Sequence, residues 1–520
     1  MTPPTGSPSG ISTPLSSTSA AAEDDVLSRP NLDDNGGNDN DKKEPSRLNE
    51  HTNSIPNPNP NPNPKPKKPS KSNPLQIGII NFLNTKQHQH HPPALPKRFT
   101  IYPPLLLLPS NAFSSPPEWA ALYASLPPTQ RQELYACIAS SFASKGVTHI
   151  AMNAPIAPTM GGGDSAEGGG GGIENRIRSP MGLVPLFGDF GEGEGEEKLG
   201  RASSSSSSCL DGSVSVGGGV GPSGEEEKEA YPTQAALESA LWVRCVQNRG
   251  VVQVWAPLHS MFSRGNVVEK ARILGLEGTF EGLDGLGGGG GRRRLDQSLS
   301  DVSVVDMYAG IGYFVFSYLK RGVGRVWGWE INGWSIEGLR RGCEENGWGV
   351  RIVRVDRGSG NLDVEGGIEG LVDSLREEDR AVVFHGDNRF AADVLGRVKG
   401  AMERKGEGNM WKPIRHVNLG LLPTSKPAWD GAVRILDVQR GGWVHVHENV
   451  DVRDIEKMEK DVVQGFDHLI RSSRGSEDTK PAVIPKAECV HAERVKTYAP
   501  GVMHCVFDIY IPPGDGRGEE

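Results

Sequence analysis

The sequence is poor in cysteine, and its cysteines are widely spaced. The chain has 520 residues, of which six are Cys, and none of these lies in a Cys-x-x-Cys pair. Structural zinc sites and iron–sulfur clusters, including the three-cysteine motif of radical enzymes, depend on closely spaced cysteines. The sequence therefore predicts no metal site and argues against radical chemistry.

Long apolar runs are missing as well. The longest, Leu105–Leu108, lies between prolines and is far too short to cross a bilayer. The N-terminus has no basic stretch followed by an apolar one, as a secretory signal would have. We expect a protein without membrane contact in a reducing, cytoplasmic compartment.

An excess of basic charge is also lacking. The formal net charge is -9, so the chain as a whole is not a basic nucleic-acid binder. Any contact with RNA must then come from local patches, and the overall charge is only weak evidence against such contact.

Glycine and proline, by contrast, are abundant and unevenly spread. Tracts rich in Ser, Pro, Asn and Gly have too little apolar content to join a core, which predicts disorder. The expected organisation is a disordered tail at 1–94, a smaller α+β N-terminal domain at 95–300 with inserts near 161–172 and 192–229, an α/β domain at 301–512 and a polar tail at 513–520. A strand at Arg98–Tyr102 and two helices within Glu118–Ser144 are expected to open the first domain.

Short apolar segments alternate with helical stretches from residue 302 onward, which is the signature of a parallel α/β sheet. The predicted strands are Val302–Asp306, Val326–Glu330, Val350–Val355, Ala381–Phe384, His416–Leu421, Trp443–His447 and Cys505–Ile511. Strands in this arrangement suit a Rossmann-like sheet of the class I methyltransferase type.

The segment from Val304 to Gly312 reads as a buried strand that runs into a glycine-containing turn. Such a turn lets backbone N–H groups and a helix N-terminus approach a ligand closely. A dinucleotide fingerprint would have a third glycine where this chain has Val315. The pattern favours a nucleoside without a pyrophosphate over NAD or FAD, and an ordinary strand-to-helix turn is the alternative.

Polar residues end or follow the next strands. Glu330 comes 24 residues after Asp306, at a place where a carboxylate can accept hydrogen bonds from both ribose hydroxyls. Asp387 and Asn388 follow a further strand, where they are candidates for reading an adenine amino group. A surface glutamate and a short Asx turn are the respective alternatives.

Another strand leads into Asn418-Leu-Gly-Leu-Leu-Pro-Thr-Ser. Methyltransferases that act on a nitrogen often have Asn/Asp-Pro-Pro-Tyr here, and the Pro-Pro-aromatic element is absent. The departure favours another kind of transfer, although a variant loop in a plain methyltransferase would look the same.

Four segments together resemble the wybutosine-synthesising tRNA aminocarboxypropyltransferases, their fungal members especially. These are MFSRGNVVEKARIL from Met261, DMYAGIGYF from Asp306, HGDNR from His385 and NLGLLPTS from Asn418. The segments HVHENV, VKTYAPGVMHCVFDIYI and RSPMGLVPLFGDFG are similar to the same family. The resemblance spans about residues 97–511 outside the low-complexity inserts.

The resemblance implies an enzyme that transfers the 3-amino-3-carboxypropyl group of S-adenosylmethionine to carbon 7 of 4-demethylwyosine at position 37, in the anticodon loop of tRNA(Phe), and releases methylthioadenosine. The cofactor contacts that it implies are Ser263, Lys270, Glu330, Asp387 and Asn388. A hydroxyl and an ammonium suit the carboxylate of the methionine part. Arg264 suits an RNA phosphate. No nucleophile or acid–base pair stands out, and Asn418 is a weak candidate for contact with the base.

Two other interpretations stay open. A tRNA guanine-37 nitrogen-1 methyltransferase has a similar layout, would also use the Asp306 turn and Glu330, and would release S-adenosylhomocysteine. A non-catalytic RNA-binding protein would keep the fold without binding S-adenosylmethionine. The intact set of candidate cofactor contacts argues against it.

Overall fold

The computed structural model describes residues 72–86, 92–153, 183–191, 231–262, 266–284, 295–406, 408–474 and 485–514. It also gives the backbone of two short paired strands, β4 (Thr159–Met160) and β5 (Ile173–Glu174). Most of the expected tail at 1–94, both expected inserts and the end of the polar tail lie outside these residues.

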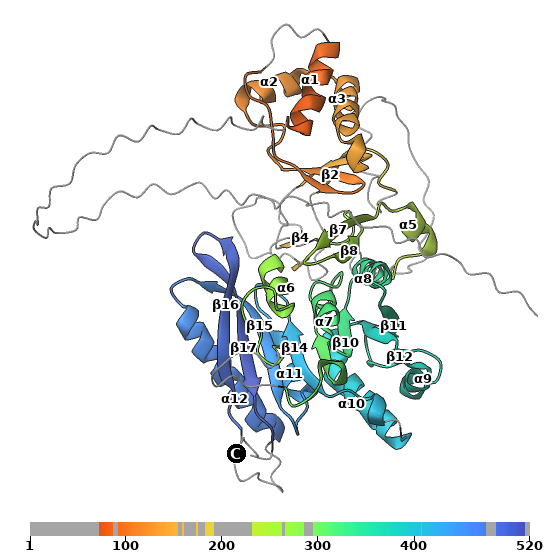
Figure 1. Ribbon diagram of the computed structural model, residues 1–520, viewed down its shortest axis with the longest axis vertical. Coiled ribbons are helices and arrows are strands. Elements are labelled where there is room, and N and C mark those ends of the chain that lie inside the picture. Colours follow the sequence, from red (N-terminus) through yellow and green to blue (C-terminus); the bar gives the residue numbers. More distant parts are fainter. Residues whose placement is uncertain are drawn as a thin grey trace, which may run out of the picture. The chain divides into compact units, whose positions relative to one another are not determined.

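The N-terminal part combines helices with a small mixed sheet (Figure 1). The helices are α1 (Pro74–Thr85), α2 (Pro117–Ser125) and α3 (Pro128–Ser141). The sheet has the order β1 (Thr100–Tyr102), β2 (Leu105–Leu108), β3 (His149–Met152) and β6 (Val184–Phe187). Strands β2 and β3 are parallel and the other pairs antiparallel. The predicted opening strand and the predicted pair of helices are confirmed.

Helix α1 lies inside the stretch whose composition predicts disorder. Four of its apolar side chains are at most 1% exposed: Leu75, Ile79, Phe82 and Leu83. The helix packs closely on α3, because a Cβ added at Gly78 would lie 2.6 Å from Cα of Ile138. The prediction of disorder is therefore wrong for Pro74–Thr85. Apolar residues at helical spacing behind the N-cap Asn73 outweigh the polar composition around them.

Two truncations are expected to differ in thermal stability. A chain that begins at Ser72 keeps α1 and should retain the melting temperature of the full chain. A chain that begins at Pro96 loses four apolar side chains from the N-terminal core, each worth at most about 1.5–3 kcal/mol, and should melt at a lower temperature. Thermal denaturation of both truncations checks this, and equal melting temperatures would contradict it.

The C-terminal part is built on a nine-stranded sheet (Figure 1) with the order β12-β11-β13-β10-β9-β14-β15-β17-β16. The strands are β9 (Ser303–Asp306), β10 (Arg325–Glu330), β11 (Gly349–Val355), β12 (Leu362–Asp363), β13 (Asp379–His385), β14 (Ile414–Leu419), β15 (Gly442–Asp451), β16 (Glu488–Ala499) and β17 (Val502–Ile511). From β11 to β15 in this order neighbours are parallel, whereas β12, β17 and β16 run antiparallel to the strands they join. All strands predicted after residue 302 are present, and the α/β class is confirmed.

The two faces of this sheet carry separate cores, because successive side chains of a strand point in opposite directions. Val305 and Trp327 belong to one core, and Val304 and Val326 to the other. Helices α9 (Gly367–Ser374), α10 (Ala391–Arg404), α11 (Trp429–Ile435) and α12 (Ile455–Arg474) cover the first face, and α7 (Val315–Arg321) and α8 (Gly333–Glu345) cover the second. The sheet is therefore buried on both sides.

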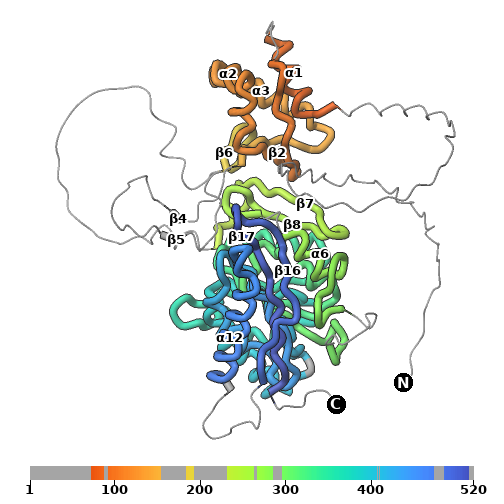
Figure 2. Tube along the Cα trace, turned by 90° about the vertical axis from the view of Figure 1, so that its left-hand side faces the viewer, coloured from red at the N-terminus to blue at the C-terminus, as the bar shows by residue number. Residues whose placement is uncertain are grey.

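A further segment precedes the sheet and packs on its second face. It contains α5 (Gln234–Ser239), the hairpin of β7 (Val243–Gln247) and β8 (Val251–Trp255), and α6 (Val267–Ile273). Ile273 and Phe280 share a core with β9 and α7. Figure 2 shows α6 and α12 on opposite sides of β16 and β17. The sequence-based prediction placed this segment in the N-terminal domain. The predicted domain limit at residue 300 stays a prediction.

Candidate functional site

The turn after β9 is held in a conformation that requires glycine. Gly310 and Gly312 have φ angles of +54° and +88°, in the left-handed region that other residues rarely adopt. The turn lies at the carboxyl edge of the parallel strands, where open α/β sheets bind their ligands. The predicted glycine turn is thus present at the expected edge.

Glu330 ends β10 and connects to this turn directly. Its Oε2 accepts a hydrogen bond from the N–H of Gly310 at 2.8 Å, and its Oε1 accepts from the N–H groups of Ile331 at 3.0 Å and Asn332 at 2.8 Å. Burial raises the pKa of Glu330, and these N–H groups oppose the rise. A carboxylate has about four lone-pair positions, so these three bonds leave room for a ligand hydroxyl.

The loop after β13 brings Asp387 and Asn388 to the same edge. Asp387 caps a short 3₁₀ turn, since its Oδ1 accepts from the N–H of Arg389 at 3.0 Å. The Asx-turn alternative is therefore present at this position. Asn388 Nδ2 donates to the carbonyl of Met307 at 2.8 Å, which ties the end of β13 to the end of β9. Contact of either side chain with an adenine stays a prediction.

Lys270, on α6, is a buried ammonium group with 3% of its surface exposed. Its Nζ donates to Oε1 of Gln247 at 3.2 Å and of Gln253 at 3.1 Å, and it lies over the rings of Phe262 and Tyr313. These described partners are neutral. Burial lowers the pKa of Lys270 to about 8, as is usual for an ammonium taken out of water. The other predicted contact on this segment, Ser263, lies outside the described residues, as does Arg264.

Tyr313 links Lys270 to the glycine turn. The ammonium lies 5.4 Å from the centre of the Tyr313 ring, and a Cβ added at Gly310 would lie 2.7 Å from the same ring. The structure therefore brings Lys270 beside the turn that also contacts Glu330. Sequence reasoning missed Tyr313, although an aromatic residue directly after the glycine turn was visible in the sequence.

Asp306 and Asn418 form a buried polar pair at the ends of β9 and β14. Asn418 Nδ2 donates to Oδ1 of Asp306 at 3.3 Å, and both residues are 0% exposed. Asp306 Oδ2 and Asn418 Oδ1 have no hydrogen-bond partner among the described residues. Burial raises the pKa of Asp306 to about 7. The pair therefore offers two acceptor atoms to a donor, and contact of Asn418 with a substrate base stays a prediction.

Among the residues that the structure describes, no three His, Cys, Asp or Glu side chains lie close enough together to hold a metal ion.

Comparison with known proteins adds an independent observation. The chain is 31% identical over 441 residues to tRNA wybutosine-synthesizing protein 2 of Schizosaccharomyces pombe, covering 84% of this chain and 78% of that protein. It is 29% identical over 444 residues to the protein of the same name from Saccharomyces cerevisiae, covering 80% and 74%. The structure of Pyrococcus horikoshii TYW2 in complex with MeSAdo aligns with a TM-score of 0.42 at 16% identity over 84% of this chain and 99% of that chain. No family model matches the chain.

Proposed function

This chain belongs to the tRNA wybutosine-synthesizing protein 2 family. We propose that it transfers the 3-amino-3-carboxypropyl group of S-adenosylmethionine to carbon 7 of 4-demethylwyosine in tRNA. The observation that carries the proposal is the buried ammonium of Lys270, whose described partners are neutral and which lies beside the turn that contacts Glu330. A ligand that brings a ribose to Glu330 and a carboxylate to Lys270 satisfies both ends of this site.

The remaining polar groups fit the same donor. The unpartnered acceptors of Asp306 and Asn418 suit an ammonium group, which the methionine part of S-adenosylmethionine carries. Asp387 and Asn388, after β13, are proposed to contact the adenine. Ser263 is proposed to join Lys270 at the carboxylate. Each polar part of the donor thus has a candidate partner.

We propose that the orientation of S-adenosylmethionine in the site decides which of its three carbon–sulfur bonds is broken. S-adenosylmethionine supplies a sulfonium whose three attached carbons are all electrophilic, so the carbon that is aimed at the acceptor is the one transferred. Lys270, on a segment before the sheet, is proposed to fix the arm and hence this aim. Asn418 begins a segment without the Pro-Pro-aromatic element of nitrogen methyltransferases, and it is proposed to contact the acceptor base.

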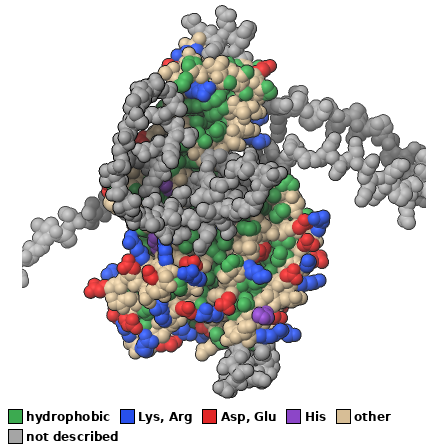
Figure 3. Space-filling model, turned by 180° about the vertical axis from the view of Figure 1, so that it is seen from behind, with side chains coloured by type: hydrophobic (Ala, Val, Ile, Leu, Met, Phe, Trp, Pro, Cys, Tyr) green, Lys and Arg blue, Asp and Glu red, His purple; other side chains and the backbone are tan. Residues whose placement is uncertain are grey.

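The proposed RNA partner is tRNA(Phe), contacted at its anticodon loop. On the face that Figure 3 shows, basic and acidic side chains of the described residues are interspersed, in keeping with a net charge of -9. RNA binding is therefore expected to depend on local groups rather than on a broad basic face. Among the described helices, none is both long enough and apolar enough to cross a membrane. The proposed location, from the sequence, is the cytoplasm.

The coproduct distinguishes this function from its rivals. With S-adenosylmethionine and tRNA(Phe) bearing 4-demethylwyosine, mass spectrometry should detect methylthioadenosine and a nucleoside heavier by one aminocarboxypropyl group. Detection of S-adenosylhomocysteine instead would favour a tRNA guanine-37 nitrogen-1 methyltransferase. A chain that fails to bind S-adenosylmethionine at all would favour a non-catalytic RNA-binding protein.

The affinity for S-adenosylmethionine is expected to fall as the pH rises above about 8, where the free protein loses the proton of Lys270. Only the protonated form can pair with a carboxylate, so the dissociation constant should rise by up to about tenfold per pH unit above this pKa. Calorimetry between about pH 7 and pH 9.5 measures this. The variant Lys270→Met should bind about 10–100-fold more weakly at neutral pH. Any pH dependence that it retains belongs to the donor's own amino group or to Asp306, whose pKa is about 7. A wild-type affinity that stays constant to the upper pH would remove Lys270 from the carboxylate.

A further inference from the structure

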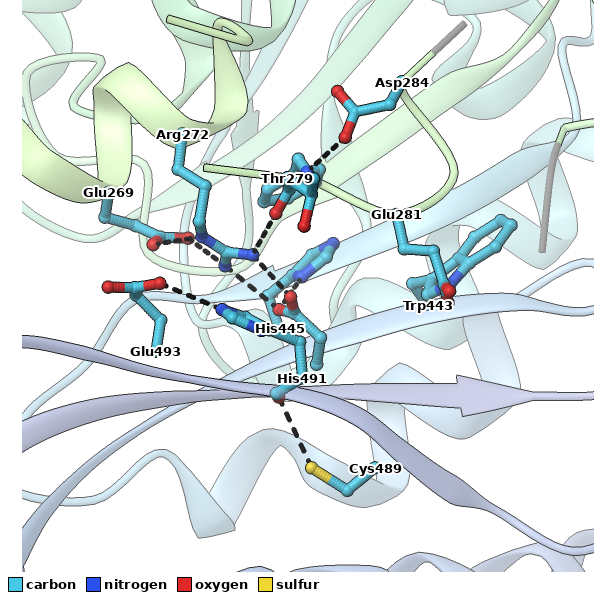
Figure 4. Close-up of polar contacts among 12 residues, drawn as sticks. Glu269, Arg272, Thr279, Glu281, Asp284, Trp443, His445, Cys489, His491 and Glu493 are labelled. Carbon is cyan, nitrogen blue, oxygen red and sulfur yellow. Dashed lines mark hydrogen bonds and ion pairs between the residues drawn. The ribbon is translucent and has the colours of Figure 1, made fainter. Parts of the chain in front are cut away.

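A buried network of charged groups lies on the side of α6 that faces the sheet (Figure 4). The guanidinium of Arg272 binds two carboxylates at once. It contacts Glu269 at 2.7 and 2.9 Å and Asp508 on β17 at 2.6 and 3.2 Å. All three side chains are at most 1% exposed. Both pairs are bidentate, the geometry in which a guanidinium fixes a carboxylate most firmly.

The network continues from Asp508 across the sheet. Asp508 Oδ1 lies 2.7 Å from Nδ1 of His445 on β15, and Nε2 of His445 lies 3.0 Å from Nδ1 of His416 on β14. Asp508 and His445 are direct partners in the antiparallel ladder, so their side chains lie on the same face of the sheet. Arg272 also donates to the carbonyl of Thr279 at 3.2 Å. One guanidinium therefore connects α6, the loop after it and β17. Through Asp508 and His445 the network reaches β15, and through His416 it reaches β14.

Helix α6 depends on such anchoring. It has seven residues, far fewer than a helix needs to be stable in water on its own. Residues two positions apart on a helix point about 200° apart, so Lys270 and Arg272 face different sides. Their partners agree with this, since Lys270 contacts Gln247 and Gln253 on the β7–β8 hairpin, whereas Arg272 contacts Asp508 on the large sheet. The position of the Lys270 ammonium is thus set by how α6 is fixed on its opposite side.

We propose that the network of Glu269, Arg272, Asp508 and His445 is a positioning device for Lys270, which holds α6 on β17 and β15 so that the ammonium stays at the carboxylate of the aminocarboxypropyl arm. The inference rests on the proposed function, because it takes Lys270 as the group that holds the arm. Its members are positioning residues, since none of them is placed in contact with the donor.

Two ligands separate this role from a general effect on stability. S-adenosylmethionine carries the arm, whereas 5′-methylthioadenosine has the nucleoside and the sulfur without it. In the full chain, Asp508→Asn keeps the shape of the side chain and removes its charge. It should weaken S-adenosylmethionine binding about tenfold, as expected when a charge-assisted contact is displaced. The dissociation constant of 5′-methylthioadenosine should stay within about twofold of the wild-type value. Calorimetry with both ligands measures the difference.

A double-mutant cycle with Lys270→Met tests whether the network acts through Lys270. In that background Asp508→Asn should cause no further loss of S-adenosylmethionine affinity, because the group that it positions is already gone. The matched control is Asp379→Asn, which breaks the Arg351–Asp379 ion pair at the beginning of β13. This control should leave the affinities for both ligands unchanged.

Several outcomes would overturn the inference. These are an equal loss of affinity for both ligands, an additive loss in the cycle, or an unchanged affinity of Asp508→Asn for S-adenosylmethionine. If Asp508→Asn does not fold, Arg272→Lys keeps the charge without the planar fork and must show the same selectivity for the ligand with the arm. Failure of the proposed function would look different, because the wild-type chain would then bind neither ligand or would release S-adenosylhomocysteine.

Discussion

Replacing Glu330 by alanine is expected to weaken the binding of S-adenosylmethionine by about a hundredfold or more while the fold is kept. A hydrogen bond to a charged acceptor contributes about 1.5–3 kcal/mol. The three N–H groups leave the carboxylate one position for a ribose hydroxyl, so the loss of that bond, together with the loosened turn, accounts for this factor. The same carboxylate accepts from the N–H of Gly310 and from two N–H groups after β10, so alanine also loosens the turn that faces the ligand. Glu330 is only half-buried, and water can replace the carboxylate at these N–H groups.

Calorimetry with two ligands and a conservative variant makes this prediction specific. Both S-adenosylmethionine and 5′-methylthioadenosine contain the ribose, so Glu330→Ala should weaken the binding of both ligands by a similar factor. The variants at Lys270 and Asp508, by contrast, should weaken the binding of S-adenosylmethionine alone. Glu330→Gln keeps one acceptor oxygen, so its affinity for both ligands should fall by less, about tenfold. An unchanged melting temperature serves as the control for folding. If Glu330→Ala binds both ligands like the wild type, Glu330 has no part in the site.

The central strands were predictable from sequence because parallel strands buried on both faces read as continuous apolar runs. Val302–Asp306 and Ala381–Phe384 are of this kind, and both coincide with strands of the large sheet. The edge strands β12 and β16 were missed. The first has two residues, and the second, Glu488–Ala499, is polar and partly exposed, so it lacks the apolar signal. Helix α1 was missed because a short apolar pattern lies next to a long polar tract.

The spacing of residues along the sequence also predicted part of the candidate site. Glu330 was found from its distance to the glycine turn, and the structure confirms that it ends a strand and contacts Gly310. Contacts that depend on strand register could not be predicted from the sequence. Arg272 and Asp508 are 236 positions apart, and only the pairing of β15 with β17 turns Asp508 toward α6. The Asp306–Asn418 pair likewise depends on two strands that are adjacent in the sheet but distant in the chain.

The aminocarboxypropyl arm, and not the methyl group, is expected to enter the tRNA. Lys270 on α6 is proposed to hold the arm, and the segment from Asn418 lacks the Pro-Pro-aromatic element that often fixes a nitrogen acceptor beside a donor methyl. Correct positioning of reacting atoms contributes about 7–11 kcal/mol in favourable cases, and a carbon turned away from the acceptor gains little of this. Selectivity between the two carbons should therefore be close to complete.

Transfer of label from S-adenosylmethionine tests the proposed reaction most directly. The donor is labelled in the methyl group in one experiment and in the carboxyl group in the other, and tRNA(Phe) bearing 4-demethylwyosine is the acceptor. The proposed function predicts that only the carboxyl label enters the tRNA, while the methyl label leaves with methylthioadenosine. Entry of the methyl label, with release of S-adenosylhomocysteine, would contradict it and identify a methyltransferase.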